Sequence, residues 1–123
     1  MIDTHCHLYD EKLYSNLEQI IINANDANIE KMICIGDNLA TSEKSIKISE
    51  TYQNIYATTG IHPHEAKNAP ISYLSILEKK ATHNKVVAIG EIGLDYYYNF
   101  SDSDIQKKIF FDQLKLAKKL NLP

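Results

Sequence analysis

The feature that most constrains the fold is a regular alternation of short apolar runs with longer amphipathic segments. Four apolar runs are typical of buried strands, and they occupy residues 1–5, 31–36, 54–60 and 85–90. Apolar residues recur at helical spacing over residues 13–27, 41–51, 70–82 and 103–120. Asn28 is placed to end the first of these segments, and Ser103 and Gln106 have the spacing of a capping box at the start of the last. Consecutive runs begin roughly 30 residues apart, which is the length of one strand–helix–strand unit. The pattern therefore predicts four parallel β/α units with right-handed crossovers.

Two architectures accommodate alternating strands and helices: an open doubly wound sheet and a (β/α)8 barrel. Periodicity alone does not separate them. In both architectures the functional groups lie where the parallel strands end. The polar residues of this chain follow that rule, because histidines and acidic or amide residues come at or just after the ends of the apolar runs: His5 and His7, Asp37 and Asn38, His62 and His64, and Glu91.

The composition of the 123-residue chain suits one globular domain or a part of one. The net charge is −3 and all 13 basic residues are lysines, so a nucleic acid would have to be recognised locally or through metal ions. No apolar run approaches the ~20 residues that cross a membrane, and no secretory leader is evident. Cys6 and Cys34 lie in apolar runs, and we expect both to be reduced, as in a cytoplasmic protein.

The first chemistry-bearing cluster is a histidine pair in the opening run. Alternate residues of a strand point to the same side, so His5 and His7 project together while Cys6 points away. Two neutral imidazoles at a strand end are suited to holding a divalent metal. The alternative is a pair of histidines in a turn, one of them hydrogen-bonded.

The second cluster is the stretch Gly60-Ile61-His62-Pro63-His64. Gly60 ends the third run and permits a close approach of another backbone, and Pro63 stiffens the segment between the two imidazoles. The functional interpretation is that these histidines contact a substrate anion or transfer a proton. The alternative is a rigid loop with exposed histidines.

The third cluster is residues 90–98, which read Gly-Glu-Ile-Gly-Leu-Asp-Tyr-Tyr-Tyr. Glu91 directly follows a buried run, where an unpaired carboxylate is unfavourable, so a cation is its natural partner. A lysine or a helix terminus is the alternative partner. The tyrosines supply either packing or faces on which bases stack. No P-loop, serine elbow or Cys-x-x-Cys pair is present, so covalent catalysis by serine or cysteine has no support in the sequence.

Together the three clusters resemble the TatD family of metal-dependent deoxyribonucleases, in the amidohydrolase-like barrel group. Residues 3–8, which read Asp-Thr-His-Cys-His-Leu, are similar to the family's first signature. Residues 60–64 and 90–96 match its next two signatures in order and spacing. One departure is Tyr9, where the family often has an acid, and we expect Asp10 to substitute for it in part.

The resemblance implies an α/β fold of the (β/α)8 TIM-barrel type, with about 250 residues in a full-length member. Residues 1–123 then form the N-terminal half of the barrel and supply its first four β/α units. The family's remaining metal ligands, two histidines and an aspartate, come from the second half, so this fragment lacks them and is not expected to hydrolyse DNA alone. DNA is the substrate that the resemblance implies, and no membrane is involved.

The resemblance also implies a set of site residues. Two divalent ions, Mg, Mn or Zn, would be bound by residues that include His5, His7 and Glu91. The candidate substrate-binding residues are His62, near the phosphate, and His64, Asp95 and Tyr96. The implied reaction is hydrolysis of a phosphodiester with the help of both metal ions.

Two further hypotheses stay open beside this one. The first is a metallohydrolase that acts on another ester or on an amide, since this barrel group supports many chemistries. The second is a non-catalytic half-barrel that self-associates, because its outer strands have unpaired edges. In that case two copies forming a homodimer would close one barrel about a two-fold axis.

Overall fold

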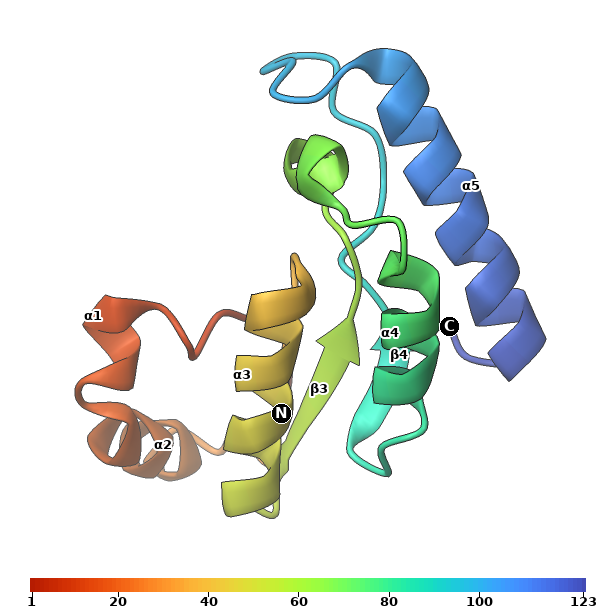
Figure 1. Cartoon of the computed structure of the whole chain (residues 1–123). Coiled ribbons are helices and arrows are strands. Elements are labelled where there is room, and N and C mark those ends of the chain that lie inside the picture. The colour runs from red at the N-terminus through yellow and green to blue at the C-terminus, as the bar shows by residue number, and fades with distance from the viewer.

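The computed structural model describes residues 1–123 as a parallel sheet with helices between consecutive strands (Figure 1). The strands are β1 (Ile2–Cys6), β2 (Lys31–Cys34), β3 (Ile55–Thr59) and β4 (Val86–Ile89). The helices are α1 (Glu11–Tyr14), α2 (Leu17–Asp26), α3 (Leu39–Thr51), the 3-10 helix η1 (Pro63–Asn68), α4 (Tyr73–Ala81) and α5 (Ser103–Leu120). All four apolar runs are therefore strands, as predicted. None of the helices has the length and apolar composition needed to cross a bilayer.

The order of the strands separates the two candidate architectures. They lie side by side as β1-β2-β3-β4, and each neighbouring pair is parallel. A doubly wound sheet reverses its strand order at a switch point, whereas a barrel adds each strand beside the preceding one. The observed order is that of four successive barrel units. Figure 1 shows α3 and α4 covering the sheet and α5 running beside α4.

The core consists of two main apolar clusters. One lies among η1, α4, β4 and α5 and comprises Ile61, Ala66, Tyr73, Leu77, Ile89, Ile109, Leu116 and Ala117. The other joins β2 to α2 and α3 and comprises Leu8, Ile21, Met32, Cys34, Ile48 and Ile55. Cys6 and Cys34 are register partners on β1 and β2, and both are free thiols, as predicted.

The helix predicted over residues 13–27 is divided in the structure. The Asp10 side chain accepts the backbone N–H of Lys12 and starts α1 early, and Asn16 then begins the separate helix α2. Asn28 follows α2 in the left-handed conformation, with φ of 59°, as predicted for the end of that helix.

The capping box predicted at the start of α5 is wrong. Asp102, rather than Ser103, is the N-cap, and its side chain accepts the backbone N–H of Asp104. The side chain of Gln106 is fully buried and bonds elsewhere, to the segment between β4 and α5. A reciprocal capping box occurs instead on α3, between Asn38 and Thr41.

Candidate metal centre

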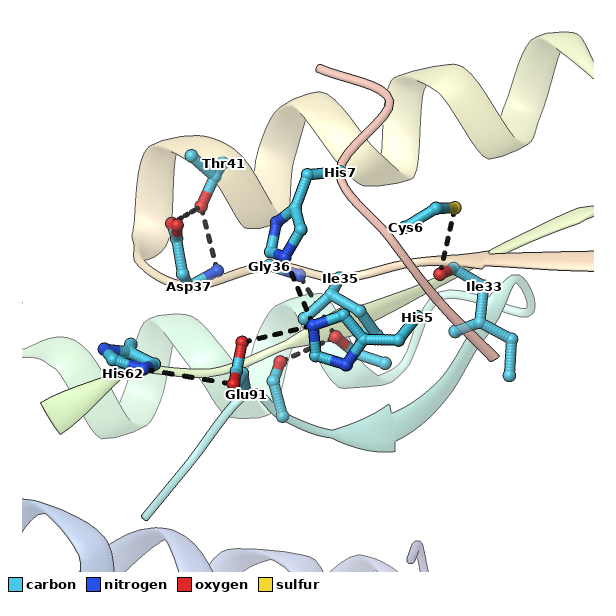
Figure 2. Close-up of polar contacts among 12 residues, drawn as sticks. His5, Cys6, His7, Ile33, Ile35, Gly36, Asp37, Thr41, His62 and Glu91 are labelled. Atoms are coloured by element: carbon cyan, nitrogen blue, oxygen red, sulfur yellow. Dashed lines mark hydrogen bonds and ion pairs between the residues drawn. The ribbon is translucent and has the colours of Figure 1, made fainter. Parts of the chain in front are cut away.

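The three residues predicted as metal ligands meet at the carboxyl ends of the strands. Their ligand atoms all lie within 4.8 Å of one another. Nε2 of His5 lies 3.2 Å from Nε2 of His7 and 3.5 Å from Oε2 of Glu91 (Figure 2). Two ligand atoms that each bond one cation at about 2.1 Å are separated by roughly 3–3.5 Å. The arrangement of these side chains therefore fits a single divalent ion.

The position of Glu91 depends on a close approach of the segments that follow β2, β3 and β4. A Cβ atom added to Gly60 would lie 2.6 Å from the carbonyl carbon of Gly90, so only glycine fits there. This confirms the predicted close approach. The backbone N–H of Gly90 donates to Thr59 O at 2.9 Å, and that of Glu91 donates to Gly36 O at 2.7 Å. The carboxylate is thereby held beside the end of β1.

A hydrogen-bond chain runs away from the metal ligands through Tyr9. The Tyr9 hydroxyl donates to Oδ2 of Asp37 at 3.2 Å, and Nδ1 of His7 lies 2.6 Å from the same hydroxyl oxygen. Because the single hydroxyl proton goes to Asp37, Nδ1 of His7 is the donor in the second bond. Nε2 of His7 then carries a lone pair, which is the tautomer that a metal requires.

The Asp37 carboxylate, at the end of this series of hydrogen bonds, is itself held in place. The Thr41 hydroxyl donates to Oδ1 of Asp37 at 2.5 Å, at the start of α3. Burial raises the pKa of Tyr9, and the nearby Asp37 carboxylate raises it further, so the phenol stays protonated. Asp10, expected to substitute in part for an acid at position 9, caps α1 with its side chain. The contribution of Asp37 was missed, and its only sequence signal was its place after the second apolar run.

His62 lies on the other side of Glu91. Its Nδ1 accepts the backbone N–H of His64 at 3.1 Å, so the ring proton is on Nε2. Nε2 lies 3.9 Å from Oε1 of Glu91 (Figure 2). Burial lowers the pKa of His62, and the Glu91 carboxylate opposes this effect, so the neutral ring is favoured.

His64 and Asp95, two of the candidate substrate-binding residues, pair with each other. Nε2 of His64 lies 2.5 Å from Oδ2 of Asp95, and Oδ1 of Asp95 accepts the backbone N–H groups of Tyr97 and Tyr98. The hydrogen bond from His64 holds the pKa of the Asp95 carboxyl below its usual range. Tyr96 is exposed. These residues therefore shape the segment between β4 and α5, next to the candidate centre.

The sequence of this chain is similar to a family model and to the sequences of known proteins. A family model described as TatD related DNase matches residues 2–123. Over its whole length the chain is 39% identical to an uncharacterized metal-dependent hydrolase, YabD, of Bacillus subtilis, and it spans 48% of that protein. It is 31% identical to the 3'-5' ssDNA/RNA exonuclease TatD of Escherichia coli and spans 47% of it. The chain thus spans about half the length of the curated relatives it matches.

Solved structures agree with the sequences. YJJV, a TatD homolog from Escherichia coli, superposes with a TM-score of 0.92 at 32% identity, over 100% of this chain and 48% of its own. An uncharacterized amidohydrolase from Saccharomyces cerevisiae superposes with a TM-score of 0.73 at 19% identity, over 95% of this chain and 44% of its own, and shows the same fold. The predicted fold class, four β/α units of a TIM-type barrel, is confirmed.

Proposed function

The chain belongs to the TatD-related DNase family, and on this premise we propose that it is the N-terminal half of a metal-dependent hydrolase of DNA phosphodiester bonds. The observation that supports this most is the convergence of His5, His7 and Glu91 within 4.8 Å. Two imidazoles and a carboxylate are a donor set that Zn and Mn accept, and Mg is held through carboxylates.

We assign one divalent ion to Nε2 of His5, Nε2 of His7 and Oε2 of Glu91. The second carboxylate oxygen of Glu91 faces His62 and is free to contact a second ion, so Glu91 is the residue suited to bridge a dinuclear centre. The other ligands of such a centre would come from the part of the family's length that this chain does not span, since it spans 48% of YabD. Divalent ions bound here supply Lewis-acid polarisation of a phosphoryl oxygen.

The neighbouring residues of this chain hold the substrate rather than react with it. His62 is held neutral with its proton on Nε2, so it is suited to donate a hydrogen bond to a phosphate oxygen beside Glu91. A neutral donor of this kind gives up no proton to the carboxylate and keeps Glu91 available to metal. Asp37 and Tyr9 keep Nε2 of His7 unprotonated.

Manganese binding to the 123-residue chain tests the assignment directly. Calorimetry is expected to give a saturable Mn²⁺ site that Glu91→Gln weakens at least about tenfold, because the variant keeps the size of the side chain and loses its charge. Glu50→Gln is the matched control, since Glu50 pairs with His83, outside the candidate centre. Equal Mn²⁺ affinity in Glu91→Gln and the unmodified chain would contradict the proposal.

Hydrolysis is tested on the chain extended to the full length of the family, because residues 1–123 alone lack the other proposed ligands. We expect phosphodiester cleavage of single-stranded DNA and of bis(p-nitrophenyl) phosphate by this longer protein to require added Mn²⁺ or Mg²⁺ and to be lost in Glu91→Gln. Cleavage restricted to carboxylic esters or amides would favour the other metallohydrolase hypothesis. Metal binding without cleavage, together with a stable dimer in light scattering, would favour the non-catalytic half-barrel.

A further inference from the structure

The hydroxyl of Thr58, near the end of β3, links the ends of three neighbouring strands. It donates to the carbonyl oxygen of Gly90, after β4, at 2.7 Å, and it accepts the backbone N–H of Gly36, after β2, at 3.1 Å. A carbonyl group cannot donate and an N–H group cannot accept, so the direction of both bonds is fixed. Thr58 is only 4% exposed, so both bonds are shielded from water.

The peptide unit between Gly90 and Glu91 is thereby held at both of its polar groups. Its carbonyl oxygen accepts the Thr58 hydroxyl, and its N–H donates to Gly36 O at 2.7 Å. Because Gly36 also gives its own N–H to Thr58, the three bonds close a ring that joins the ends of β2, β3 and β4. The peptide unit cannot rotate without breaking one of these bonds. Thr58 is the one side chain that hydrogen-bonds to it.

An irregularity in the pairing of β3 with β4 brings the Thr58 hydroxyl to Gly90. Ala57 is the register partner of Val86, whereas the next residue, Thr58, is the partner of Ala88. One additional residue of β4 is accommodated at this point, and irregularities of this kind redirect side chains next to functional sites. A Cβ atom built on Gly90 would lie 4.0 Å from the Thr58 hydroxyl oxygen, which is ordinary van der Waals contact. The hydroxyl therefore lies directly against this glycine.

The orientation of the Glu91 carboxylate matters because its two oxygens face different groups. Oε2 lies 3.5 Å from Nε2 of His5, and Oε1 lies 3.9 Å from Nε2 of His62 (Figure 2). Rotation of the backbone that carries the carboxylate would separate it from one of these neighbours. Metal ligands have to be held within about 0.5 Å of their binding geometry, and the groups that hold them typically change metal affinity 10–100-fold.

Thr59 provides a comparison within the same strand. It follows Thr58, it is fully buried, and its hydroxyl has no hydrogen-bond partner. Adjacent residues of a strand point to opposite faces of the sheet, so only one of the two threonines reaches Gly36 and Gly90. The two residues are alike in type and burial and differ in what their hydroxyls bond.

We propose that Thr58 is a positioning residue for metal binding: its hydroxyl fixes the peptide unit between Gly90 and Glu91 and thereby directs the Glu91 carboxylate to the ion. This inference rests on the proposed function, which assigns Glu91 to the metal. It deepens that function by adding a residue that contacts neither the metal ligands' donor atoms nor a substrate and acts through the backbone.

The first test is the affinity of the 123-residue chain for Mn²⁺, measured by calorimetry. Thr58→Val keeps the shape of the side chain and removes both hydrogen bonds, and we expect it to lower the Mn²⁺ affinity about tenfold. Thr58→Ala also lacks the hydroxyl and is expected to show the same loss. Thr58→Ser retains the hydroxyl and is expected to keep the affinity of the unmodified chain. Thr59→Val is the matched control and should leave Mn²⁺ affinity unchanged, since the hydroxyl it removes bonds nothing.

The second test, the visible absorption of bound Co²⁺, separates positioning from a loss of folded protein. The absorption bands depend on the number and arrangement of the ligands. At saturating Co²⁺ only the folded, metal-bound chain contributes to them. We expect Thr58→Val to alter the spectrum, and Thr58→Ser and Thr59→Val to give the spectrum of the unmodified chain.

Three results overturn the inference while Glu91→Gln still weakens Mn²⁺ binding, so the proposed function stands. The first is unaltered Mn²⁺ affinity in Thr58→Val and Thr58→Ala. The second is an equal loss in Thr58→Ser and Thr58→Val, which assigns the effect to packing. The third is an unaltered Co²⁺ spectrum in Thr58→Val, which assigns a lower affinity to a less stable fold. Equal Mn²⁺ affinity in Glu91→Gln and the unmodified chain refutes the proposed function and this inference together.

Discussion

The hydroxyl oxygen of Tyr9 lies 2.6 Å from Nδ1 of His7, although the two residues come from the short stretch between β1 and α1. The same hydroxyl donates a hydrogen bond to Oδ2 of Asp37, which follows β2, at 3.2 Å. A histidine that ligates metal typically donates its other ring N–H to a carboxylate or carbonyl group. In this protein the Tyr9 hydroxyl lies between the imidazole of His7 and the carboxylate of Asp37, so Asp37 acts on His7 indirectly, through the phenol.

Tyr9→Phe is therefore expected to weaken metal binding with little effect on the fold. The variant removes the acceptor of the Nδ1 proton of His7 and frees that ring to change tautomer. Loss of such a partner typically lowers metal affinity 10–100-fold, and we expect a decrease of about tenfold for Mn²⁺ measured by calorimetry. Tyr14→Phe removes an exposed phenol from α1 and serves as the control. Unaltered Mn²⁺ affinity in Tyr9→Phe would show that Tyr9 does not position His7.

Gly60→Ala tests whether the close backbone approach holds Glu91 in place. The new methyl group would lie 2.6 Å from the carbonyl carbon of Gly90, so the segment carrying Glu91 has to move. We expect a loss of about 1–3 kcal/mol in the free energy of unfolding and a parallel loss of Mn²⁺ affinity. Gly93→Ala is the matched control, because nothing lies within 4 Å of its added Cβ. If both variants bind Mn²⁺ alike, the approach at Gly60 has no role in the site.

The strands and the meeting of His5, His7 and Glu91 were predictable from the sequence. Short unbroken apolar runs at regular spacing leave few alternatives to parallel strands, and the ends of parallel strands share one edge of the sheet. Polar residues placed at or just after the ends of those runs must then lie near one another, and the family resemblance singles out His5, His7 and Glu91 among them. The prediction needed no knowledge of side-chain conformation.

The contacts between loops were not predictable in the same way. Tyr9 reaches Asp37 only because of the register between β1 and β2, which no local pattern specifies. Gln106 looked like half of a capping box, since its spacing from Ser103 is right for one. Gln106 does not form that capping box, because its amide is buried and bonds three backbone groups of the segment between β4 and α5.

Gln106→Ala is expected to release the segment between β4 and α5. It leaves the N–H and carbonyl groups of Asp95 and the carbonyl of Ser101 without their partner, and buried groups of this kind are costly to leave unpaired. We expect the free energy of unfolding in urea to fall by about 2–4 kcal/mol and proteolysis within residues 94–101 to accelerate. Gln19→Ala, on the exposed face of α2, should change neither measurement. Slow proteolysis of Gln106→Ala would mean that the segment is held by its rings instead.

Because of a contact between α4 and α5, the free energy of unfolding is expected to decrease at low pH. The buried Tyr73 hydroxyl donates to Oδ2 of Asp112 at 2.7 Å, and Lys108 donates to the same oxygen at 2.6 Å. These bonds, that from Lys108 first, hold the pKa of the Asp112 carboxyl below its usual range. A lowered carboxyl pKa gives stability that is present above the usual value near 4 and is lost as the pH falls through the lowered one.

The Tyr73→Phe variant measures how much the hydrogen bond from Tyr73 to Asp112 contributes to the free energy of unfolding. It removes one hydrogen bond to a carboxylate, so we expect a loss of about 1 kcal/mol in the free energy of unfolding at pH 7, measured in urea. The difference from the unmodified chain should shrink as the pH falls below about 4 and through the lowered pKa of Asp112, because the carboxyl is then protonated in both proteins. Asp104→Asn, which alters an exposed ion pair with Lys107 on the same helix, should leave the pH 7 value within about 0.5 kcal/mol. A Tyr73→Phe deficit that stays constant across the acid range would assign the loss to packing, not to the carboxylate.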